Sequence, residues 1–217
     1  MSIELFGHPF SSYTQKVLIP LWANETPFEY RVVALDHPEN VEALKRHSPF
    51  GQFPLLIDGD FALFESTPII EYLQDCHPGP NIWIPSGALG RRVRFFDRFF
   101  DLHVMNNMQA VVGDALRPDE SRDPYGVARY REGLNIAYDW LEGQIGNEWA
   151  VGDTFTLADC SAAPSLFYAD WVEEIGSKRP RLSAYRSRLL AHPTVARAVD
   201  EGRPYRPYFP LGAPDRD

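Results

Sequence analysis

A change of hydrophobic pattern near residue 80 constrains the fold of this 217-residue chain more than any other feature. Before it, short runs of β-branched and aromatic residues alternate with segments whose apolar residues recur at helical spacing. After it, every periodic segment has helical spacing. The proline- and glycine-rich run 77–80 separates the two parts. We therefore expect a small α/β domain at residues 1–79 and an all-α domain at residues 87–217.

The residue pattern of the first part predicts seven elements in the order β-α-β-α-β-β-α. The clearest signal is Asp58-Gly59, which stands between two apolar runs and is typical of a tight antiparallel hairpin. The strands are expected at 3–6, 28–35, 53–57 and 61–64, and the helices at 12–24, 38–47 and around 69–73.

The second part predicts a bundle of helices. Its segment 157–171 is largely apolar, which predicts a place at the centre of that bundle. From Arg203 onward several prolines predict an irregular tail. The other helical stripes lie within 95–104, 130–141, 182–190 and 195–199.

Charge and composition exclude several classes of function. The net charge of −9 disfavours general binding to nucleic acid, because an acidic surface repels phosphates. The two cysteines, Cys76 and Cys160, form no CxxC pair, and no apolar run approaches the length of a membrane span. Metal-binding, nucleotide-binding and serine-hydrolase motifs are absent from the sequence. We expect a cytoplasmic protein that binds no membrane, nucleic acid or metal.

Five motifs, taken in order and spacing, resemble those of the cytosolic glutathione S-transferases. The resemblance spans nearly the whole chain and implies a thioredoxin-like α/β domain followed by an all-helical domain. Its serine-bearing first motif resembles the zeta, theta and related bacterial classes. The motifs are Pro9-Phe10-Ser11-Ser12-Tyr13, Ser48-Pro49-Phe50-Gly51-Gln52-Phe53-Pro54, Glu65-Ser66-Thr67-Pro68-Ile69-Ile70-Glu71-Tyr72-Leu73, Thr156-Leu157-Ala158-Asp159 and His192-Pro193-Thr194-Val195.

The first motif carries the candidate catalytic residues Ser11, Ser12 and Tyr13. A hydroxyl that donates to the thiol sulfur of glutathione favours the reactive thiolate, and a helix N-terminus adds positive potential. The resemblance assigns this role to Ser11, with Ser12 next and Tyr13 third. One of the two serines is equally suited to capping the helix, so one can cap while the other binds sulfur.

The second and third motifs imply a glutathione-binding surface. A cis peptide bond at Pro54 would present the backbone of Phe53 to the cysteinyl backbone of glutathione, and Gln52 would reach the glycyl end. Glu65 can accept from the γ-glutamyl ammonium, while Ser66, as helix cap, can hold the carboxylate. Glutathione is thus expected as co-substrate.

The remaining implications concern the second substrate, the partner and the helical domain. The family places a hydrophobic electrophile between the domains, where Phe10, His103 and Asn107 are candidates to line its pocket. A homodimer is also implied. Thr156 and Asp159 have capping-box spacing, which indicates a structural role, and Cys160 is expected to be buried.

Three alternatives to a transferase stay open. A maleylacetoacetate-isomerase-like enzyme would use the same thiolate, but that class carries Ser-Ser-Cys where this chain has Tyr13. A non-catalytic binding protein with this fold is disfavoured by the intact site motifs. A thiol oxidoreductase needs a cysteine that residues 9–13 lack. Among glutathione chemistries, dehalogenation and peroxide reduction share the same site.

Overall fold

A four-stranded sheet organises the first part of the chain, of which the computed structural model describes residues 3–217. The strand order is β2-β1-β3-β4, with β1 parallel to β2 and with β3 antiparallel to both β1 and β4. The predicted order of seven elements is confirmed. The strands are β1 (Ile3–Gly7), β2 (Phe28–Val32), β3 (Leu55–Asp58) and β4 (Phe61–Phe64).

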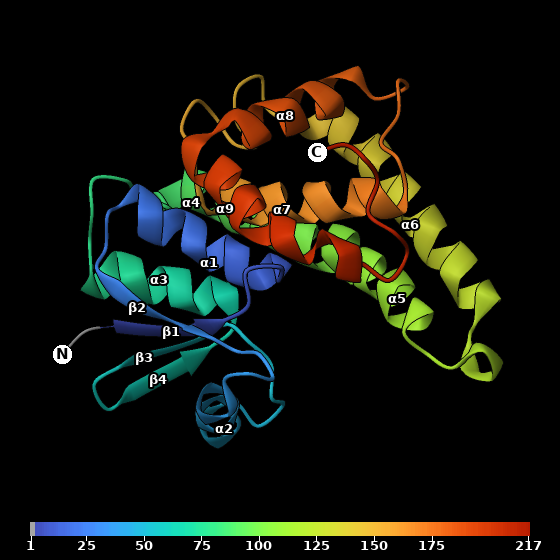
Figure 1. Ribbon diagram of the computed structural model, residues 1–217. Helices are drawn as coiled ribbons and strands as arrows, with labels where there is room; N and C mark the ends of the chain where they lie inside the picture. Colours follow the sequence, from blue (N-terminus) through green and yellow to red (C-terminus); the bar gives the residue numbers. More distant parts are fainter. Residues whose placement is uncertain (1–2) are drawn as a thin grey trace.

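Two helices cover one face of the sheet and a third covers the other. Helices α1 (Ser12–Ala23) and α3 (Ser66–Cys76) lie between the sheet and the helical part, and α2 (Pro38–His47) lies beneath (Figure 1). Helix α1 is buried on most of its surface because it contacts α3 on one side and α7 and α9 on the other. Helix α2 buries only Asn40 and Leu44, as expected for a helix on an outer face.

The position of the hairpin loop and the end of β2 each differ from the prediction by a few residues. Asp58 pairs with Phe61, so the hairpin loop is Gly59-Asp60, one residue later than expected. Gly59 has φ +61°, a conformation that glycine adopts without steric cost. Strand β2 ends at Val32 rather than at Leu35, whose side chain is fully exposed.

The second part is the predicted helical bundle. Helix α7 occupies its centre and every one of its residues is buried, which confirms the placement. Within residues 3–217 no helix is long and apolar enough to cross a membrane. The helices are α4 (Gly87–Phe99), α5 (Asn106–Ala115), α6 (Pro124–Gln144), α7 (Leu157–Val172), α8 (Pro180–Ala191) and α9 (Pro193–Gly202).

A π-helical segment, Phe100–Met105, joins α4 to α5 in one continuous helical rod. The sequence pattern did not predict it. A π turn holds an extra residue, so it shifts which side chains of α5 share a face with those of α4. That shift matters for the site described below.

The start of α7 is fixed by Asp159. Its carboxylate accepts hydrogen bonds from the backbone of Thr156 and Ala150, both at 2.8 Å, and from the Tyr185 hydroxyl at 2.7 Å. The capping box with Thr156 is therefore confirmed. Cys160, the next residue, is fully buried as expected.

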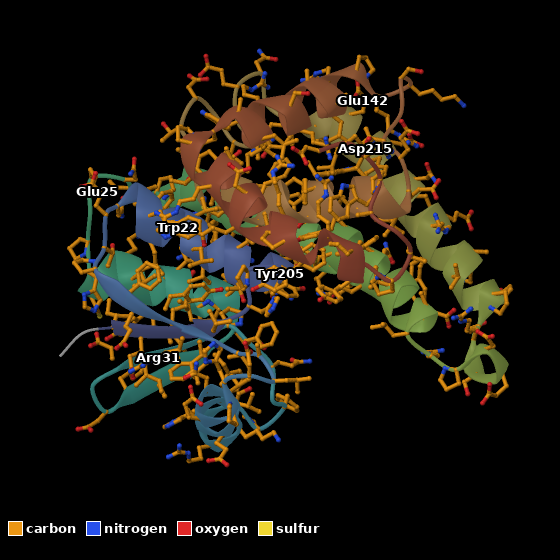
Figure 2. The ribbon with its side chains drawn as sticks, in the orientation of Figure 1. Trp22, Glu25, Arg31, Glu142, Tyr205 and Asp215 are labelled. Carbon is orange, nitrogen blue, oxygen red and sulfur yellow. The ribbon has the colours of Figure 1, made fainter. Side chains whose placement is uncertain are left out.

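The C-terminal segment is more ordered than its prolines suggest. Arg203–Tyr208 forms a 3₁₀ helix that carries Tyr205 (Figure 2). The Tyr205 ring packs edge-on against His8, with ring centroids 4.5 Å apart. Asp217 then pairs with Arg203, and with Arg206 at 3.0 Å. The predicted irregular tail is corrected: these ion pairs close the segment on itself, and Arg216 pairs with Asp170 of α7 at 3.4 Å, which holds the segment against the bundle.

Candidate active site

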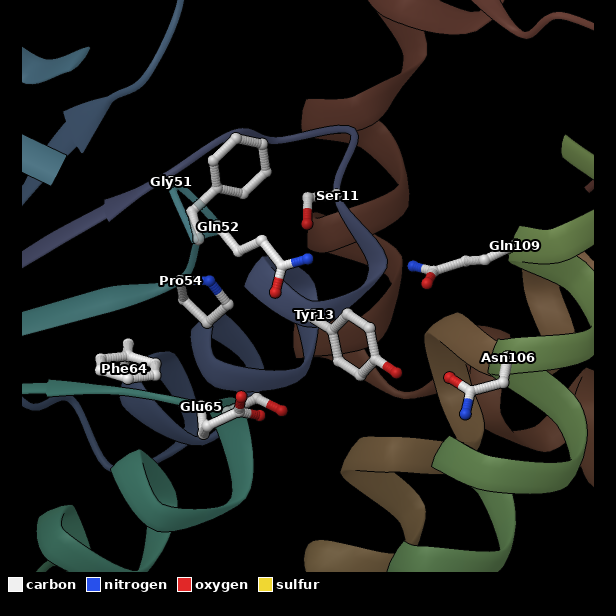
Figure 3. A pocket seen from close by; sticks show the side chains of 11 residues that line it. Ser11, Tyr13, Gly51, Gln52, Pro54, Phe64, Glu65, Asn106 and Gln109 are labelled. Atoms are coloured by element: carbon white, nitrogen blue, oxygen red, sulfur yellow. The ribbon is translucent and has the colours of Figure 1, made fainter. Parts of the chain in front are cut away.

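A cleft of about 470 Å³ lies between the α/β part and α5. In Figure 3, side chains from the loops of the α/β part meet the side chains of α5 across it. The cleft is where the first three sequence motifs come together. Its lining residues are Ser11, Tyr13, Gly51, Gln52, Phe53, Pro54, Phe64, Glu65, Ser66, Asn106 and Gln109.

Ser11 lies at the N-terminus of α1 and opens onto the cleft. It is the N-cap residue, and its Oγ accepts a hydrogen bond from the Thr14 backbone N–H at 3.3 Å. The extended backbone of Ser11, with φ −87° and ψ 123°, is usual for a cap. A hydroxyl that accepts in this way still has its single proton to donate. One serine therefore fits both roles that the sequence reasoning divided between Ser11 and Ser12.

Of the residues next to Ser11 that the first motif proposed for the site, only Tyr13 lines the cleft. Ser12 is buried and does not line the cleft. Tyr13 lines it, and burial, followed by the negative charges of Asp101 and Glu65, holds the pKa of its hydroxyl well above the usual range. Tyr13 is therefore a protonated hydrogen-bond donor at neutral pH. Phe10 does not line the cleft, because its ring packs against Tyr168 of α7.

The loop before β3 forms the second wall. The Phe53–Pro54 peptide bond is cis. The Ser48 hydroxyl closes the loop, since its Oγ donates to the Gln52 carbonyl at 3.0 Å and accepts from the Gln52 N–H at 3.2 Å. Gln52, Phe53 and Pro54 all line the cleft. The structure thus brings this predicted set together with Ser11.

Glu65 and Ser66 form the third wall, at the N-terminus of α3. Glu65 is the cap position and has φ +86°, which is a strained conformation for a residue with a side chain. Ser66 is the first helical residue rather than the cap, which corrects the expectation by one position. Strain of this kind gathers at ligand sites, and here it directs Glu65 to the cleft.

A buried charge cluster lies behind the cleft and was missed by sequence reasoning. The Lys16 ammonium of α1 pairs with Asp97 at 2.7 Å and Asp101 at 2.9 Å, and it donates to the Thr67 hydroxyl at 2.9 Å. Lys16 and Asp97 are almost fully inaccessible. Burial raises the pKa of Asp101, and Lys16 opposes that rise. The cluster ties the first turn of α3, and so Ser66, to α1 and α4.

The α5 wall differs from the sequence expectation. Asn106 and Gln109 line the cleft, whereas His103 and Asn107 do not. His103 lies against the Phe99 ring at 4.9 Å, and Asn107 packs against Gly133 of α6. The stripe that includes Phe99, His103 and Asn107 therefore faces α6. To predict Asn106 and Gln109 as lining residues, one would need to know which face of α5 points to the cleft after the extra residue of the π segment.

Among the described residues, no group of three or more His, Cys, Asp and Glu side chains is arranged to hold a metal ion. The cleft itself offers hydrogen-bond donors and acceptors, one carboxylate and two helix N-termini. Such a set can bind an extended peptide that carries both an ammonium and a carboxylate.

Comparison with known proteins defines the class. The family model of the glutathione S-transferase N-terminal domain matches residues 5–81, and that of the C-terminal domain matches residues 104–193. Together they cover most of the chain, in the order that the fold shows. The chain belongs to the glutathione S-transferase family.

Individual relatives and solved structures support the same family. The chain is 29% identical to a probable maleylacetoacetate isomerase of Vibrio cholerae, over 94% of this chain and 98% of that protein. It is 28% identical to the glutathione S-transferase PARB of Nicotiana tabacum, over 93% of this chain and 99% of that protein. A glutathione S-transferase of Methylobacterium radiotolerans, crystallised with glutathione sulfonate, is 25% identical over 92% of this chain and 95% of its own, with a TM-score of 0.78.

Proposed function

We propose that this chain binds glutathione in the cleft, that Ser11 stabilises the thiolate, and that the thiolate adds to an electrophilic small molecule. Residues 1–79 would form the glutathione-binding domain, and residues 87–217 would close the cleft. The observation that carries the proposal is the hydrogen bond from the Thr14 N–H to Ser11 Oγ. It engages the hydroxyl as an acceptor and leaves its proton to a sulfur in the cleft.

The rest of the cleft suits the rest of glutathione. Glu65 lines the cleft and would accept from the γ-glutamyl ammonium, while Ser66 at the start of α3 would hold the adjacent carboxylate. The backbone of Phe53 would pair with the cysteinyl unit as a short added strand, and Gln52 would meet the glycyl end. The crystallised relative in complex with glutathione sulfonate supports glutathione as the ligand of this cleft.

Replacing Glu65 by glutamine tests glutathione binding directly. Glu65→Gln keeps the shape of the side chain but removes its charge, so glutathione should bind about 10- to 100-fold more weakly, as expected for losing a hydrogen bond between charged groups. Titration calorimetry measures this. Glu71→Gln is the matched control, because Glu71 lies on α3, the helix that Glu65 precedes, but pairs with Arg94 outside the cleft. A wild-type protein that shows no binding of glutathione would overturn the proposal.

A glutathione-dependent isomerase is the second candidate, favoured by the Vibrio cholerae relative. It would use the same thiolate, adding it to a cis-alkene and releasing it after rotation. Tyr13 occupies the place where that class carries cysteine, which disfavours this alternative. A non-catalytic glutathione-binding protein would bind glutathione without lowering the pKa of its thiol.

We further infer a homodimer. Phe95 on α4 and Ile136 on α6 are more than half exposed, and Phe95 contacts the Trp140 ring at 5.7 Å. This apolar face on two neighbouring helices suits contact with a second copy. Light scattering should give about twice the chain mass of 24.7 kDa. A mass of one chain at working concentration would contradict the inference.

A further inference from the structure

We propose that His8 positions Ser11 through the loop that joins β1 to α1, and that it does so only while its imidazole is neutral. The inference rests on the proposed function and concerns the regulation of the same site, because the glutathione thiolate would be stabilised less as the pH falls. His8 does not line the cleft. It is a positioning residue, and the hydrogen bonds of residues 8–11 assign it that role.

The imidazole of His8 accepts a hydrogen bond inside this loop. The Phe10 backbone N–H donates to His8 Nδ1 at 3.2 Å. A backbone N–H can only donate, so Nδ1 is the ring nitrogen that carries no proton, and the neutral ring holds its proton on Nε2. The ring therefore accepts from the N–H two residues ahead, as an asparagine side chain does in an Asx turn.

His8 binds both N–H groups of the loop. Its carbonyl accepts from the Ser11 N–H at 2.9 Å, and its ring accepts from the Phe10 N–H. Pro9 lies between them and has no N–H. The donor side of the peptide groups that lead into Ser11 is thus held by His8, in the loop that carries Ser11 to the cleft (Figure 3).

The carbonyl groups of the loop are bound by side chains that do not change charge near neutral pH. Gln15 Nε2 donates to the Pro9 carbonyl at 2.8 Å. The Tyr168 hydroxyl of α7 donates to the Phe10 carbonyl at 3.1 Å, and burial raises the pKa of Tyr168 well above its usual range. Of these hydrogen bonds, only the one to His8 Nδ1 is lost on protonation of the acceptor.

Protonation of His8 would bring two donors face to face. A proton on Nδ1 points at the Phe10 N–H, so one of the two groups must move. The Tyr205 ring lies against the His8 ring, with centroids 4.5 Å apart. The Phe10 ring packs edge-on against Tyr168, with centroids 5.4 Å apart. Because neither ring turns away without losing these contacts, the displacement falls on the backbone that precedes Ser11.

The surroundings of His8 set the direction of the pH effect. Burial lowers the pKa of its imidazole, and the carboxylate of Asp36, in the loop after β2, opposes that shift. The Tyr205 phenol of the C-terminal 3₁₀ helix and the Thr14 hydroxyl of α1 also contact His8. The ring is therefore neutral at pH 7 and gains charge in more acidic solution. Stabilisation of the thiolate is complete above the pKa of His8 and declines below it.

The experiment measures the ionisation constant of the thiol of bound glutathione, from the ultraviolet absorbance of the thiolate between pH 4.5 and pH 9. His8→Leu keeps an apolar contact with Tyr205 but removes the acceptor. It should lower that ionisation constant about 3- to 10-fold at every pH above the pKa of His8, as for one lost hydrogen bond. Calorimetry should give a glutathione affinity within about 3-fold of wild type, because Glu65, Ser66 and Phe53 are unchanged.

His8→Asn is the rescue variant. The Asn Oδ1 accepts from the N–H two residues ahead and does not titrate, so the ionisation constant of the thiol above the pKa of His8 should equal that of the wild type. Below that pKa, the His8→Asn complex should hold about 3- to 10-fold more thiolate than the wild-type complex. Proton NMR of the imidazole C–H groups gives the pKa of His8, whose signal is assigned by its loss in His8→Leu.

His192→Asn is the matched control. His192 is also half-buried, burial also lowers its pKa, and its Nδ1 lies 3.0 Å from Thr194 Oγ1. It stands at the junction of α8 and α9, outside the cleft. The thiol of glutathione bound to His192→Asn should therefore titrate as in the wild type.

Two results would overturn the inference while the proposed function stands. The first is a His8→Leu protein whose bound thiol ionises as in the wild type. The second is a His8→Asn protein that fails to restore the ionisation constant or loses thiolate at acid pH as the wild type does. If His8→Leu does not fold, the comparison of His8→Asn with the wild type decides. Failure of the proposed function is distinct, because glutathione then does not bind or Ser11→Ala leaves the thiol pKa unchanged.

Discussion

Replacing Ser11 by alanine is expected to slow conjugation about 10- to 100-fold at pH 7, the effect of losing a hydrogen bond to a charged sulfur. Glutathione affinity should change little, because Glu65, Ser66 and the Phe53 backbone are untouched. The loss should shrink as the pH rises. The Ser11 hydroxyl lowers the pKa of the glutathione thiol. At a pH above the higher thiol pKa of the variant, the thiolate forms without that hydrogen bond. Steady-state kinetics from pH 6 to pH 10 measures this.

Two further variants keep the Ser11 assignment testable. Ser11→Thr retains both the hydroxyl and the helix cap, so it should restore most of the rate. Ser12→Ala changes a buried side chain that does not line the cleft. If Ser12→Ala abolished the rate and Ser11→Ala did not, the roles of the two serines would be reversed. Helix capping by Ser11 accounts for about 1 kcal/mol of stability, so Ser11→Ala should remain folded.

Asp159→Ala is expected to lower the free energy of unfolding by about 3 to 5 kcal/mol, because it strands several buried donors at once. The carboxylate accepts from two backbone N–H groups, from the Thr156 hydroxyl at 3.1 Å and from the Tyr185 hydroxyl. The side chain is fully buried at the start of the central helix α7. Urea unfolding followed by circular dichroism measures the change.

Asp153→Ala is the matched control for this change, since Asp153 is exposed in the turn before α7 and should cost less than about 0.5 kcal/mol. Tyr185→Phe removes only one of the four hydrogen bonds and should cost about 1 to 2 kcal/mol. An Asp159→Ala protein as stable as the wild type would show that the capping box does not hold α7 in place.

Local patterns were sufficient to predict the fold. Two signals carried this prediction: the alternation of strand and helix patterns before residue 80, and the largely apolar segment that forms α7. Both are strong because they follow directly from which faces of an element are buried. The hairpin was predicted one residue early because both Asp58-Gly59 and Gly59-Asp60 satisfy the same turn preference. The folded C-terminal segment depends on contacts with residues far away in the sequence, such as the ion pair of Arg216 with Asp170, which no local pattern reports.

Site residues could be predicted from the sequence where a single short motif forms one wall of the cleft. Ser11, Phe53 and Glu65 each lie at the junction of a loop with a helix or strand, and the structure brings all three to one cleft. The α5 wall was not predictable, because the π segment changes the helical phase before Asn106. The burial of Lys16 was also missed, since a lysine in a helix ordinarily faces water and here its partners come from α3, α4 and the π segment.

The pKa of the glutathione thiol in the complex tests the central claim most directly. The ultraviolet absorbance of the thiolate, titrated with pH for the wild type and for Ser11→Ala at saturating glutathione, gives it. We expect the wild type to lower the thiol pKa below its value in water, and Ser11→Ala to lose most of that shift while still binding glutathione. A thiol pKa that is the same in water, in the wild type and in the variant would contradict thiolate stabilisation by this cleft.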